Sequence, residues 1–210
     1  TRQVPMFAKN GTKGEERELL LELKMLADVG LIGLPSVGKS SILSRISAAR
    51  PKIAAYHFTT LSPNLGVVKT GGESGFVAAD IPGLIEGAAD GAGLGHDFLR
   101  HIERCRLLLH VVDVSEEEGR DPIGDIETVN AELARYSEEL ATRLQMLVAN
   151  KADAMDSEAD YILRLREYAK EKGEELFFVS AATGEGLPEL VRAVAAKLRE
   201  LPPIRVFENH

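Results

Sequence analysis

Short apolar runs alternate with amphipathic segments along most of the 210-residue chain. Runs of four to six mainly apolar residues predict strands, and apolar residues three or four positions apart predict helices. The predicted strands are 29–32, 65–68, 75–79, 107–112, 145–149 and 176–179. The predicted helices are 40–49, 97–105, 125–140, 158–172 and 187–201. This alternation is typical of an α/β fold with a mostly parallel six-stranded sheet and helices on both faces.

Two helix-breaking signals mark the ends of the last two predicted helices. Gly173 follows the fourth predicted helix, and the pair Pro202 and Pro203 follows the last one. Neither residue type readily continues a helix at those positions. We therefore expect one domain over residues 26–201 and a tail or linker over residues 202–210.

Residues 33–40 read Gly-Leu-Pro-Ser-Val-Gly-Lys-Ser, the complete G-x-x-x-x-G-K-S pattern of a phosphate-binding loop. A predicted strand before this phosphate loop and a predicted helix after it supply the context that the motif needs. The glycines allow several backbone N–H groups to point at phosphates near the helix N-terminus. Lys39 is predicted to bind the outer phosphates and Ser40 to ligate Mg²⁺. A chance match is expected in roughly one chain in a hundred of this length.

A second motif, N-K-x-D, is formed by Asn150, Lys151, Ala152 and Asp153 at the C-terminal end of a predicted strand. Ligands of open α/β sheets bind at those ends. The Asp153 carboxylate can accept hydrogen bonds from the N1–H and exocyclic amino groups of guanine, whereas adenine lacks that pair of donors. Alone the motif is weak, since polar turns often contain these residues. Beside a phosphate loop it predicts guanine specificity.

The last predicted strand ends in the small residues Ser180, Ala181 and Ala182. A turn of small residues can bring a backbone N–H group to the carbonyl of the base. This turn is the second predicted contact with guanine, after Asp153.

Composition indicates a soluble protein of a reducing compartment. The chain has 25 Lys and Arg against 33 Asp and Glu, a formal net charge of −8, so nothing attracts it generally to nucleic acid. Its single cysteine, Cys105, excludes an internal disulfide framework. We find neither an apolar run of membrane-spanning length nor a signal-peptide pattern. We expect a cytoplasmic protein, monomeric, without disulfides or membrane contact.

Three further segments carry a resemblance to a known family. They read Tyr-His-Phe-Thr-Thr-Leu-Ser-Pro-Asn-Leu-Gly at 56–66, Asp-Ile-Pro-Gly-Leu-Ile-Glu-Gly-Ala at 80–88 and Gly-Leu-Gly-His-Asp-Phe-Leu-Arg-His-Ile-Glu-Arg at 93–104. With the two motifs, they resemble the Obg (CgtA) family of translation-factor-related GTPases. The resemblance implies a P-loop NTPase G domain that hydrolyses GTP to GDP slowly. It also implies a role in large ribosomal subunit assembly and a response to guanine nucleotide levels.

The first 25 residues have a different pattern. Leu19, Leu21, Leu23 and Met25 alternate with mostly polar residues, which is typical of a strand with one apolar face. The pattern leaves open an additional edge strand or a loose arm. The resemblance implies that residues 1–25 are a remnant of a preceding glycine-rich domain, or a linker to it.

The segments 56–66 and 80–88, named the switch segments here, are expected to carry the chemistry of GTP hydrolysis. The Thr60 hydroxyl can complete the Mg²⁺ shell while its N–H binds the γ-phosphate. Thr59 competes for this role, and the resemblance points to the second threonine. Asp80 would hold a Mg²⁺-bound water, and Gly83 would let the backbone approach the γ-phosphate closely.

The predicted site combines all these segments. Its catalytic residues are Lys39, Thr60 and Gly83, and its Mg²⁺ ligands are Ser40, Thr60 and Asp80. The predicted nucleotide-binding residues are Gly33, Leu34, Pro35, Ser36, Val37, Gly38, Lys39, Ser40, Ser41, Phe58, Thr59, Thr60, Leu61, Ser62, Asp80, Ile81, Pro82, Gly83, Asn150, Lys151, Ala152, Asp153, Ser180, Ala181 and Ala182.

Two positions shape the expected activity. Leu84 follows the switch glycine, where Ras-like enzymes keep a glutamine that orients the attacking water. Leucine can neither donate nor accept a hydrogen bond, so we expect slow hydrolysis. Ser36 stands where some K⁺-activated relatives have asparagine, and its shorter side chain weakens the case for K⁺.

The alternative to a GTP hydrolase is a nucleotide-sensing protein, responsive to GDP or ppGpp, in which hydrolysis is incidental. An ATP-using enzyme is a distant third.

Overall fold

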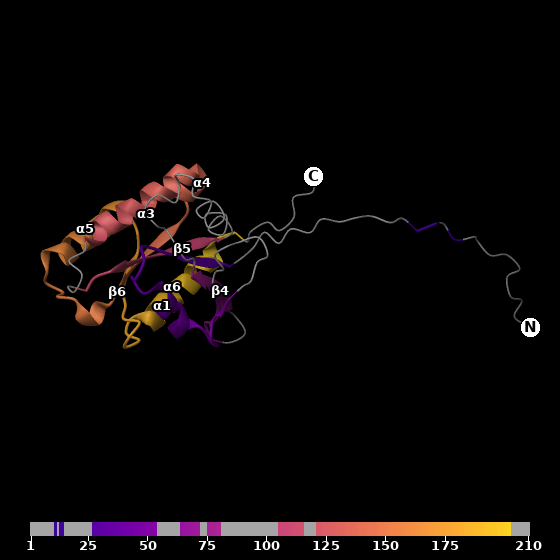
Figure 1. Ribbon diagram of the computed structural model, residues 1–210, viewed down its shortest axis with the longest axis horizontal. Coiled ribbons are helices and arrows are strands. Elements are labelled where there is room, and N and C mark those ends of the chain that lie inside the picture. Colours follow the sequence, from indigo (N-terminus) through magenta and orange to yellow (C-terminus); the bar gives the residue numbers. More distant parts are fainter. Residues whose placement is uncertain are drawn as a thin grey trace, which may run out of the picture.

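The computed structural model describes residues 11, 13–14, 27–53, 64–71, 75–80, 105–115 and 121–202. Figure 1 shows how its helices and strands are arranged. In chain order they are β1 (Val29–Ile32), α1 (Lys39–Ile46), β2 (Lys52–Ile53), β3 (Asn64–Lys69), β4 (Gly75–Asp80), β5 (Leu107–Asp113), α3 (Pro122–Tyr136), α4 (Glu138–Ala141), β6 (Gln145–Asn150), the 3-10 helix η3 (Ala152–Ala154), α5 (Asp160–Lys172), β7 (Leu176–Phe178) and α6 (Leu187–Glu200).

The strands form one sheet in the order β2-β3-β4-β1-β5-β6-β7. Strands β4, β1, β5, β6 and β7 run parallel, whereas β3 is antiparallel to both β4 and β2. The predicted class, a mostly parallel sheet with helices, is confirmed, but the sheet has seven strands instead of six. The additional strand β2 has only two residues, so it is too short to show a periodic pattern.

The predicted helix 125–140 is two helices in the structure. α3 starts earlier because the Asp121 carboxylate accepts a hydrogen bond from the Ile123 N–H at 3.3 Å, with Pro122 in the first turn. Ser137 has an extended backbone (φ −156°, ψ 130°) that ends α3 and precedes α4. Apolar spacing continues across this break, so the pattern did not reveal it.

The other helix ends follow local hydrogen bonding. α1 is shorter than predicted because the Ala48 N–H donates to the Val67 carbonyl of β3 at 2.8 Å instead of continuing the helix. Gly173, with φ 70°, ends α5 as predicted. The predicted helix 97–105 lies outside the described residues except for Cys105, which is not helical.

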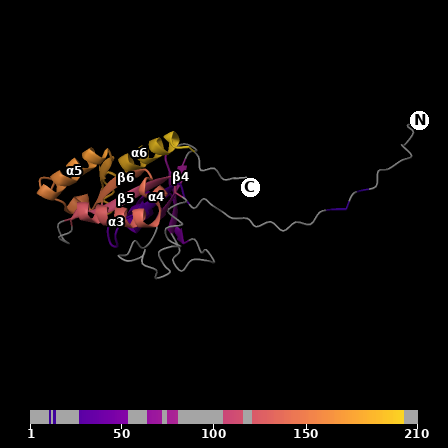
Figure 2. The ribbon, with the colours of Figure 1, turned by 90° about the horizontal axis from the view of Figure 1, so that it is seen from above.

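The helices cover both faces of the sheet (Figure 1). Leu109 of β5 packs with α1 and α6 in one apolar cluster, which includes Leu43 and Leu190. Leu108 of β5 faces the opposite side and packs with α3 and α4, with Leu133 as an α3 partner. In Figure 2, α3 and α6 lie on either side of β5 and β6. Because β5 is buried on both faces, its sequence is mainly apolar, interrupted by His110 and ended by Asp113, rather than an alternation of apolar and polar residues.

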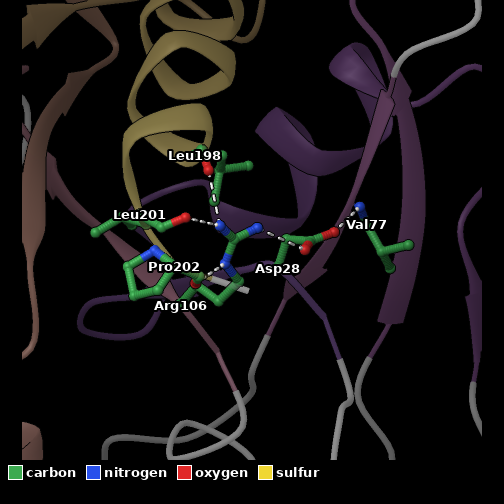
Figure 3. A network of polar contacts seen from close by, with 6 residues as sticks. All are labelled: Asp28, Val77, Arg106, Leu198, Leu201 and Pro202. Atoms are coloured by element: carbon green, nitrogen blue, oxygen red, sulfur yellow. Dashed lines mark hydrogen bonds and ion pairs between the residues drawn. The ribbon is translucent and has the colours of Figure 1, made fainter. Parts of the chain in front are cut away.

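Arg106 ties the N-terminal ends of β1 and β5 to the end of α6 (Figure 3). Its guanidinium Nη1 lies 3.5 Å from Oδ1 of Asp28, and Oδ2 of Asp28 accepts from the Val77 N–H at 3.0 Å. The guanidinium also donates to three main-chain carbonyls, those of Leu198 (2.7 Å), Leu201 (2.6 Å) and Pro202 (3.2 Å). We name these six residues the Arg106 cluster. They hold together the residue before β1, the middle of β4 and the C-terminal end of α6.

The two predicted end segments fall mostly outside the described residues. Of residues 1–25 only 11, 13 and 14 are described, and of residues 202–210 only Pro202 is. The predicted domain boundaries therefore stay predictions. No helix in the described part of the chain is long and apolar enough to cross a bilayer.

Candidate nucleotide-binding site

The predicted phosphate loop connects the C-terminal end of β1 to the start of α1. Three of its residues have positive φ angles, Gly33 (139°), Ser36 (67°) and Gly38 (95°). A Cβ at Gly33 would lie 2.2 Å from the Val111 carbonyl oxygen, and a Cβ at Gly38 would lie 2.2 Å from the side-chain nitrogen of Asn150. Both positions therefore require glycine, because β5 and β6 approach the loop backbone closely.

Lys39 is buried at the start of α1, and its ammonium group bonds back to the phosphate loop. Its Nζ donates to the carbonyls of Gly33 and Leu34, both at 2.8 Å. Burial lowers the pKa of Lys39, and the negative charge of Asp80 opposes that shift. Phosphate oxygens would offer this buried ammonium a stronger, charge-assisted set of acceptors than two neutral carbonyls.

Ser40 and Asp80 meet beside the start of α1. The Ser40 hydroxyl donates to Oδ2 of Asp80, which ends β4 and is 3% exposed. A hydroxyl and a carboxylate in contact are oxygen ligands of the kind that Mg²⁺ prefers. These two predicted metal ligands therefore fit a Mg²⁺ ion. Among the described residues no group of three or more His, Cys, Asp or Glu side chains could hold a metal by itself.

The side-chain amide of Asn150 joins two of the predicted motifs to each other. Its Nδ2 donates to the Val37 carbonyl at 2.8 Å, across 113 residues of sequence. Its Oδ1 accepts from the Ala181 N–H at 3.1 Å. Asn150 is 2% exposed, so both bonds are made inside the protein. The phosphate loop, the N-K-x-D segment and the turn after β7 are thus fixed relative to one another.

Asp113, at the end of β5, is a site residue that the sequence reasoning missed. Its carboxylate forms an ion pair with Lys151 and accepts from the N–H (2.9 Å) and hydroxyl (2.8 Å) of Ser115. Burial raises the pKa of Asp113, but the hydrogen bonds from Lys151 and Ser115 outweigh it and hold the pKa below its usual value. The available signal was an acidic residue at the end of the strand that precedes the N-K-x-D strand.

Lys151 and Asp153 lie on either side of a sharp change in chain direction. Lys151 has φ 65°, and the 3-10 helix η3 begins at the next residue. The Ala152 N–H donates to the Val179 carbonyl at 3.0 Å, which anchors η3 on the neighbouring chain segment. Asp153 is exposed on η3, so its carboxylate is accessible at the C-terminal end of β6.

The turn after β7 is organised by its own side chains and by α1. Ser180 is buried, and its Oγ accepts from the Thr183 N–H at 3.0 Å. Arg45 of α1 donates from Nε to the Ala181 carbonyl at 2.8 Å and from Nη2 to the Ala182 carbonyl. Arg45 is the second residue that the sequence reasoning missed, and no local motif marks it, since its partners lie 136 and 137 residues away.

The structure brings the described part of the predicted site to one edge of the sheet. Each part lies at the C-terminal end of a strand: the phosphate loop at β1, Asp80 at β4, the 150–153 segment at β6 and the 180–182 turn at β7. Ser41 is exposed beside Ser40. The remaining predicted residues lie outside the described residues, namely Phe58, Thr59, Thr60, Leu61, Ser62, Ile81, Pro82 and Gly83.

Two buried titratable residues lie in the core rather than at this edge. Burial raises the pKa of the Cys105 thiol to about 12, so it is no reactive thiolate at neutral pH. Burial lowers the pKa of His110, on β5, to about 4, against an opposing hydrogen bond to Gln145. The His110 Nδ1 lies 3.0 Å from Oε1 of Gln145, and its Nε2 has no hydrogen-bond partner among the described residues.

The chain was compared with known proteins. The family described as 50S ribosome-binding GTPases matches residues 28–151. The GTPase Obg of Alkaliphilus metalliredigens (strain QYMF) is 58% identical over 206 residues, which cover 98% of this chain and 48% of that protein. The GTPase Obg of Desulfitobacterium hafniense (strain DSM 10664 / DCB-2) is 58% identical over 209 residues, 99% of this chain and 48% of that protein. The chain thus spans about half the length of the curated relatives it matches.

Solved structures share the fold at lower identity. The G domain of the FeoB iron transporter of T. maritima has a TM-score of 0.59 and 21% identity, covering 81% of this chain and 97% of that one. A variant of Era from Aquifex aeolicus bound to GDP and AlF4⁻ has a TM-score of 0.59 and 23% identity, covering 87% of this chain and 59% of that one. At such identities the likeness shows a common fold and no more.

Proposed function

The chain belongs to the family of 50S ribosome-binding GTPases, and on that premise we propose that it is a guanine-nucleotide switch that hydrolyses GTP slowly with Mg²⁺. The observation that carries the proposal is the pair of buried Asn150 bonds. They join the loop suited to phosphates to the two segments suited to a purine base. A nucleotide needs both sets of groups at one fixed separation.

Base selection is assigned to the Asp153 carboxylate and to the turn at 180–182. The carboxylate accepts from the two donors of guanine, and a backbone N–H of the turn donates to its 6-oxo group. The adenine of ATP would present the opposite pattern at both places and leave the Asp153 carboxylate and the turn N–H without partners. Competition of GDP and ADP for the chain tests this directly, and a preference for ADP would reject the proposal.

Mg²⁺ and phosphate binding are assigned to the start of α1. Ser40 and Asp80 support the ion, with Thr60 as the proposed third protein group. The ion supplies charge neutralisation for the transferred phosphoryl group. Lys39 would bind the outer phosphates, and Gly83 would allow a close approach to the γ-phosphate. Ser36 offers a hydroxyl oxygen where a K⁺ ligand would stand, and we assign no K⁺ to it.

The rate is expected to be slow in the isolated chain. Leu84 cannot orient a water molecule, so this function must come from another group or from a partner. Intrinsic Ras turnover, with its glutamine, is on the order of 10⁻³ to 10⁻⁴ s⁻¹, and we expect no more than about ten times that rate here. Hydrolysis that serves as a timer would fit either a GTPase or a sensor of GDP and ppGpp.

The proposed partner is the large ribosomal subunit, and the proposed place of action is the cytoplasm, with the chain as a monomer. The family description supports the partner, whereas the acidic net charge requires that RNA contact come from a local patch or from other parts of a longer protein.

Single-turnover hydrolysis of GTP with and without 50S subunits tests the whole proposal. We expect slow turnover alone and an acceleration when the subunit is added. Turnover near 1 s⁻¹ by the chain alone, as an order-of-magnitude threshold, would contradict the slow switch. Hydrolysis that never responds to the subunit, together with nucleotide-dependent binding to it, would favour the sensor.

A further inference from the structure

Arg45 links the helix that follows the phosphate loop to the turn that is proposed to read the base. It lies on α1, six residues after Lys39. Its Nε donates to the Ala181 carbonyl at 2.8 Å, and its Nη2 donates to the Ala182 carbonyl. In the last turn of α1, the Leu43 carbonyl accepts from the N–H and the hydroxyl of Ser47. This carbonyl therefore does not need the Arg45 guanidinium as a donor.

Two N–H groups at this turn also have hydrogen-bond acceptors. The Ala181 N–H donates to Oδ1 of Asn150 at 3.1 Å, and the Thr183 N–H donates to Oγ of Ser180 at 3.0 Å. The Ala182 N–H donates to no residue in the described part of the chain. It belongs to the same planar peptide unit as the Ala181 carbonyl and points the opposite way. By holding that carbonyl, Arg45 sets the direction of the Ala182 N–H.

We propose that Arg45 is a positioning residue for guanine, holding the turn at 180–182 so that the Ala182 N–H meets the 6-oxo group of the base. This inference rests on the proposed nucleotide-binding function. Within the described part of the chain, the hydrogen bonds of Arg45 go to main-chain carbonyls of the turn, so it acts on the nucleotide through the turn. Because Arg45, Lys39 and Ser40 share one helix, the groups for phosphate and base are set by one rigid element.

The arginine side chain is suited to this task in a way that lysine is not. A guanidinium is a planar fork whose Nε and Nη2 can hold two successive carbonyls in a fixed relation. A lysine ammonium has three donors on one freely rotating nitrogen, so it has no rigid fork that fixes the relation between two carbonyls. Lysine at this position should therefore preserve charge and helix propensity but only part of the orientation.

The test measures affinity for three nucleoside diphosphates by equilibrium titration. GDP and IDP both carry the 6-oxo group, and IDP lacks the 2-amino group. The third, 6-thio-GDP, keeps the donors that face Asp153 but replaces the 6-oxo oxygen with sulfur, which is a weak acceptor. Arg45→Ala should lower the affinity for GDP and for IDP about tenfold each, and that for 6-thio-GDP no more than about threefold. Arg45→Lys should fall between the wild type and Arg45→Ala.

Arg164→Ala is the matched control, because Arg164 is an exposed arginine on α5 whose ion pair with Asp160 lies within one helix. It should leave all three affinities unchanged. Equal losses for all three nucleotides, or no loss, in an Arg45→Ala protein with the wild-type unfolding temperature would overturn the inference. Failure of the wild type to bind GDP in preference to ADP would instead reject the proposed function, so the two failures are distinguishable.

Discussion

Lys39 and Arg106 are both cations held by main-chain carbonyls, but they lie at opposite ends of β1 and β5. Lys39 follows the C-terminal end of β1 and bonds the carbonyls of Gly33 and Leu34 in its own loop. Arg106 precedes β5 and bonds three carbonyls at the end of α6, with Asp28 beside it (Figure 3). The first set of contacts is local in sequence, whereas the second joins segments 92 to 96 residues apart.

This difference separates a binding edge from a structural one. The Lys39 contacts lie within one loop and contribute little to holding distant elements together. The ammonium can therefore exchange its two carbonyl acceptors for phosphate oxygens. The bonds of Arg106 join three elements, and losing them would leave the Asp28 carboxylate without its counter-charge and three carbonyls without a donor. Similar chemistry is therefore suited to ligand binding at one end of the sheet and to folding stability at the other.

The largest expected effect is at the binding edge. Asp153→Asn should lower GDP affinity by about a thousandfold and shift preference toward xanthine nucleotides, because the amide reverses the pattern facing the base. Its stability without nucleotide should change by less than about 0.5 kcal/mol, since Asp153 is exposed. Titration with GDP and XDP, alongside urea unfolding, measures both quantities. Unchanged GDP binding would remove the guanine assignment.

At the structural edge, Arg106→Ala should reduce the free energy of unfolding by about 3 kcal/mol, the usual loss when one partner of a largely buried ion pair is removed. GDP affinity of the folded protein should be unchanged. Urea unfolding and GDP titration of the same sample test this. Arg164→Ala serves as the control for loss of an exposed arginine, and an equal loss of stability in both variants would contradict the role of the Arg106 cluster.

His110 lies on β5 between the two edges and should make stability depend on pH. Its folded-state pKa of about 4 is below the unfolded value of about 6.5, so the unfolded chain binds more protons between those pH values. Stability is therefore lost as the pH falls, by about 2 kcal/mol between pH 7 and pH 5 from this group. His110→Gln cannot titrate, so its urea unfolding should show a shallower slope over this range. An identical slope in both proteins would exclude His110 as the source.

At the proposed binding edge, loss of the buried cation should cost little stability. Lys39→Ala should change the free energy of unfolding of the nucleotide-free protein by less than about 1 kcal/mol, because it removes a buried charge together with two local bonds. The same variant should lose measurable GTP hydrolysis. Thermal unfolding without nucleotide provides the measurement. Destabilisation as large as that of Arg106→Ala would show that both cations are structural.

The kind and order of the elements could be predicted from the sequence because the cause is local. Apolar runs such as 107–112 become buried parallel strands, and Gly173 ends its helix through its own φ angle of 70°. Elements without a repeating pattern escaped prediction. The two-residue strand β2 forms only because β3 offers it a pairing edge, and Ser137 interrupts a helical pattern that looks continuous.

The candidate site divides in the same way. The chemistry of the phosphate loop and of the N-K-x-D segment follows from residue types at fixed spacing, which the sequence contains in full. The positions of Asp113 and Arg45 could not be inferred with equal ease, because what matters is which distant backbone or side-chain group each one contacts. Arg45 and its carbonyl partners are 136 and 137 residues apart, and no spacing rule connects them.

By itself, then, the sequence determined which groups are suited to a guanine nucleotide, since local backbone geometry and side-chain chemistry depend on neighbouring residues. Only the tertiary structure decided how those groups are held. Parallel pairing brings the C-terminal ends of β1, β4, β5 and β6 to one edge, where a single buried amide, that of Asn150, can bond two segments at once. The physical reason is that a hydrogen bond depends on the distance between two groups in space. Once the sheet has formed, that distance no longer follows from their separation along the chain.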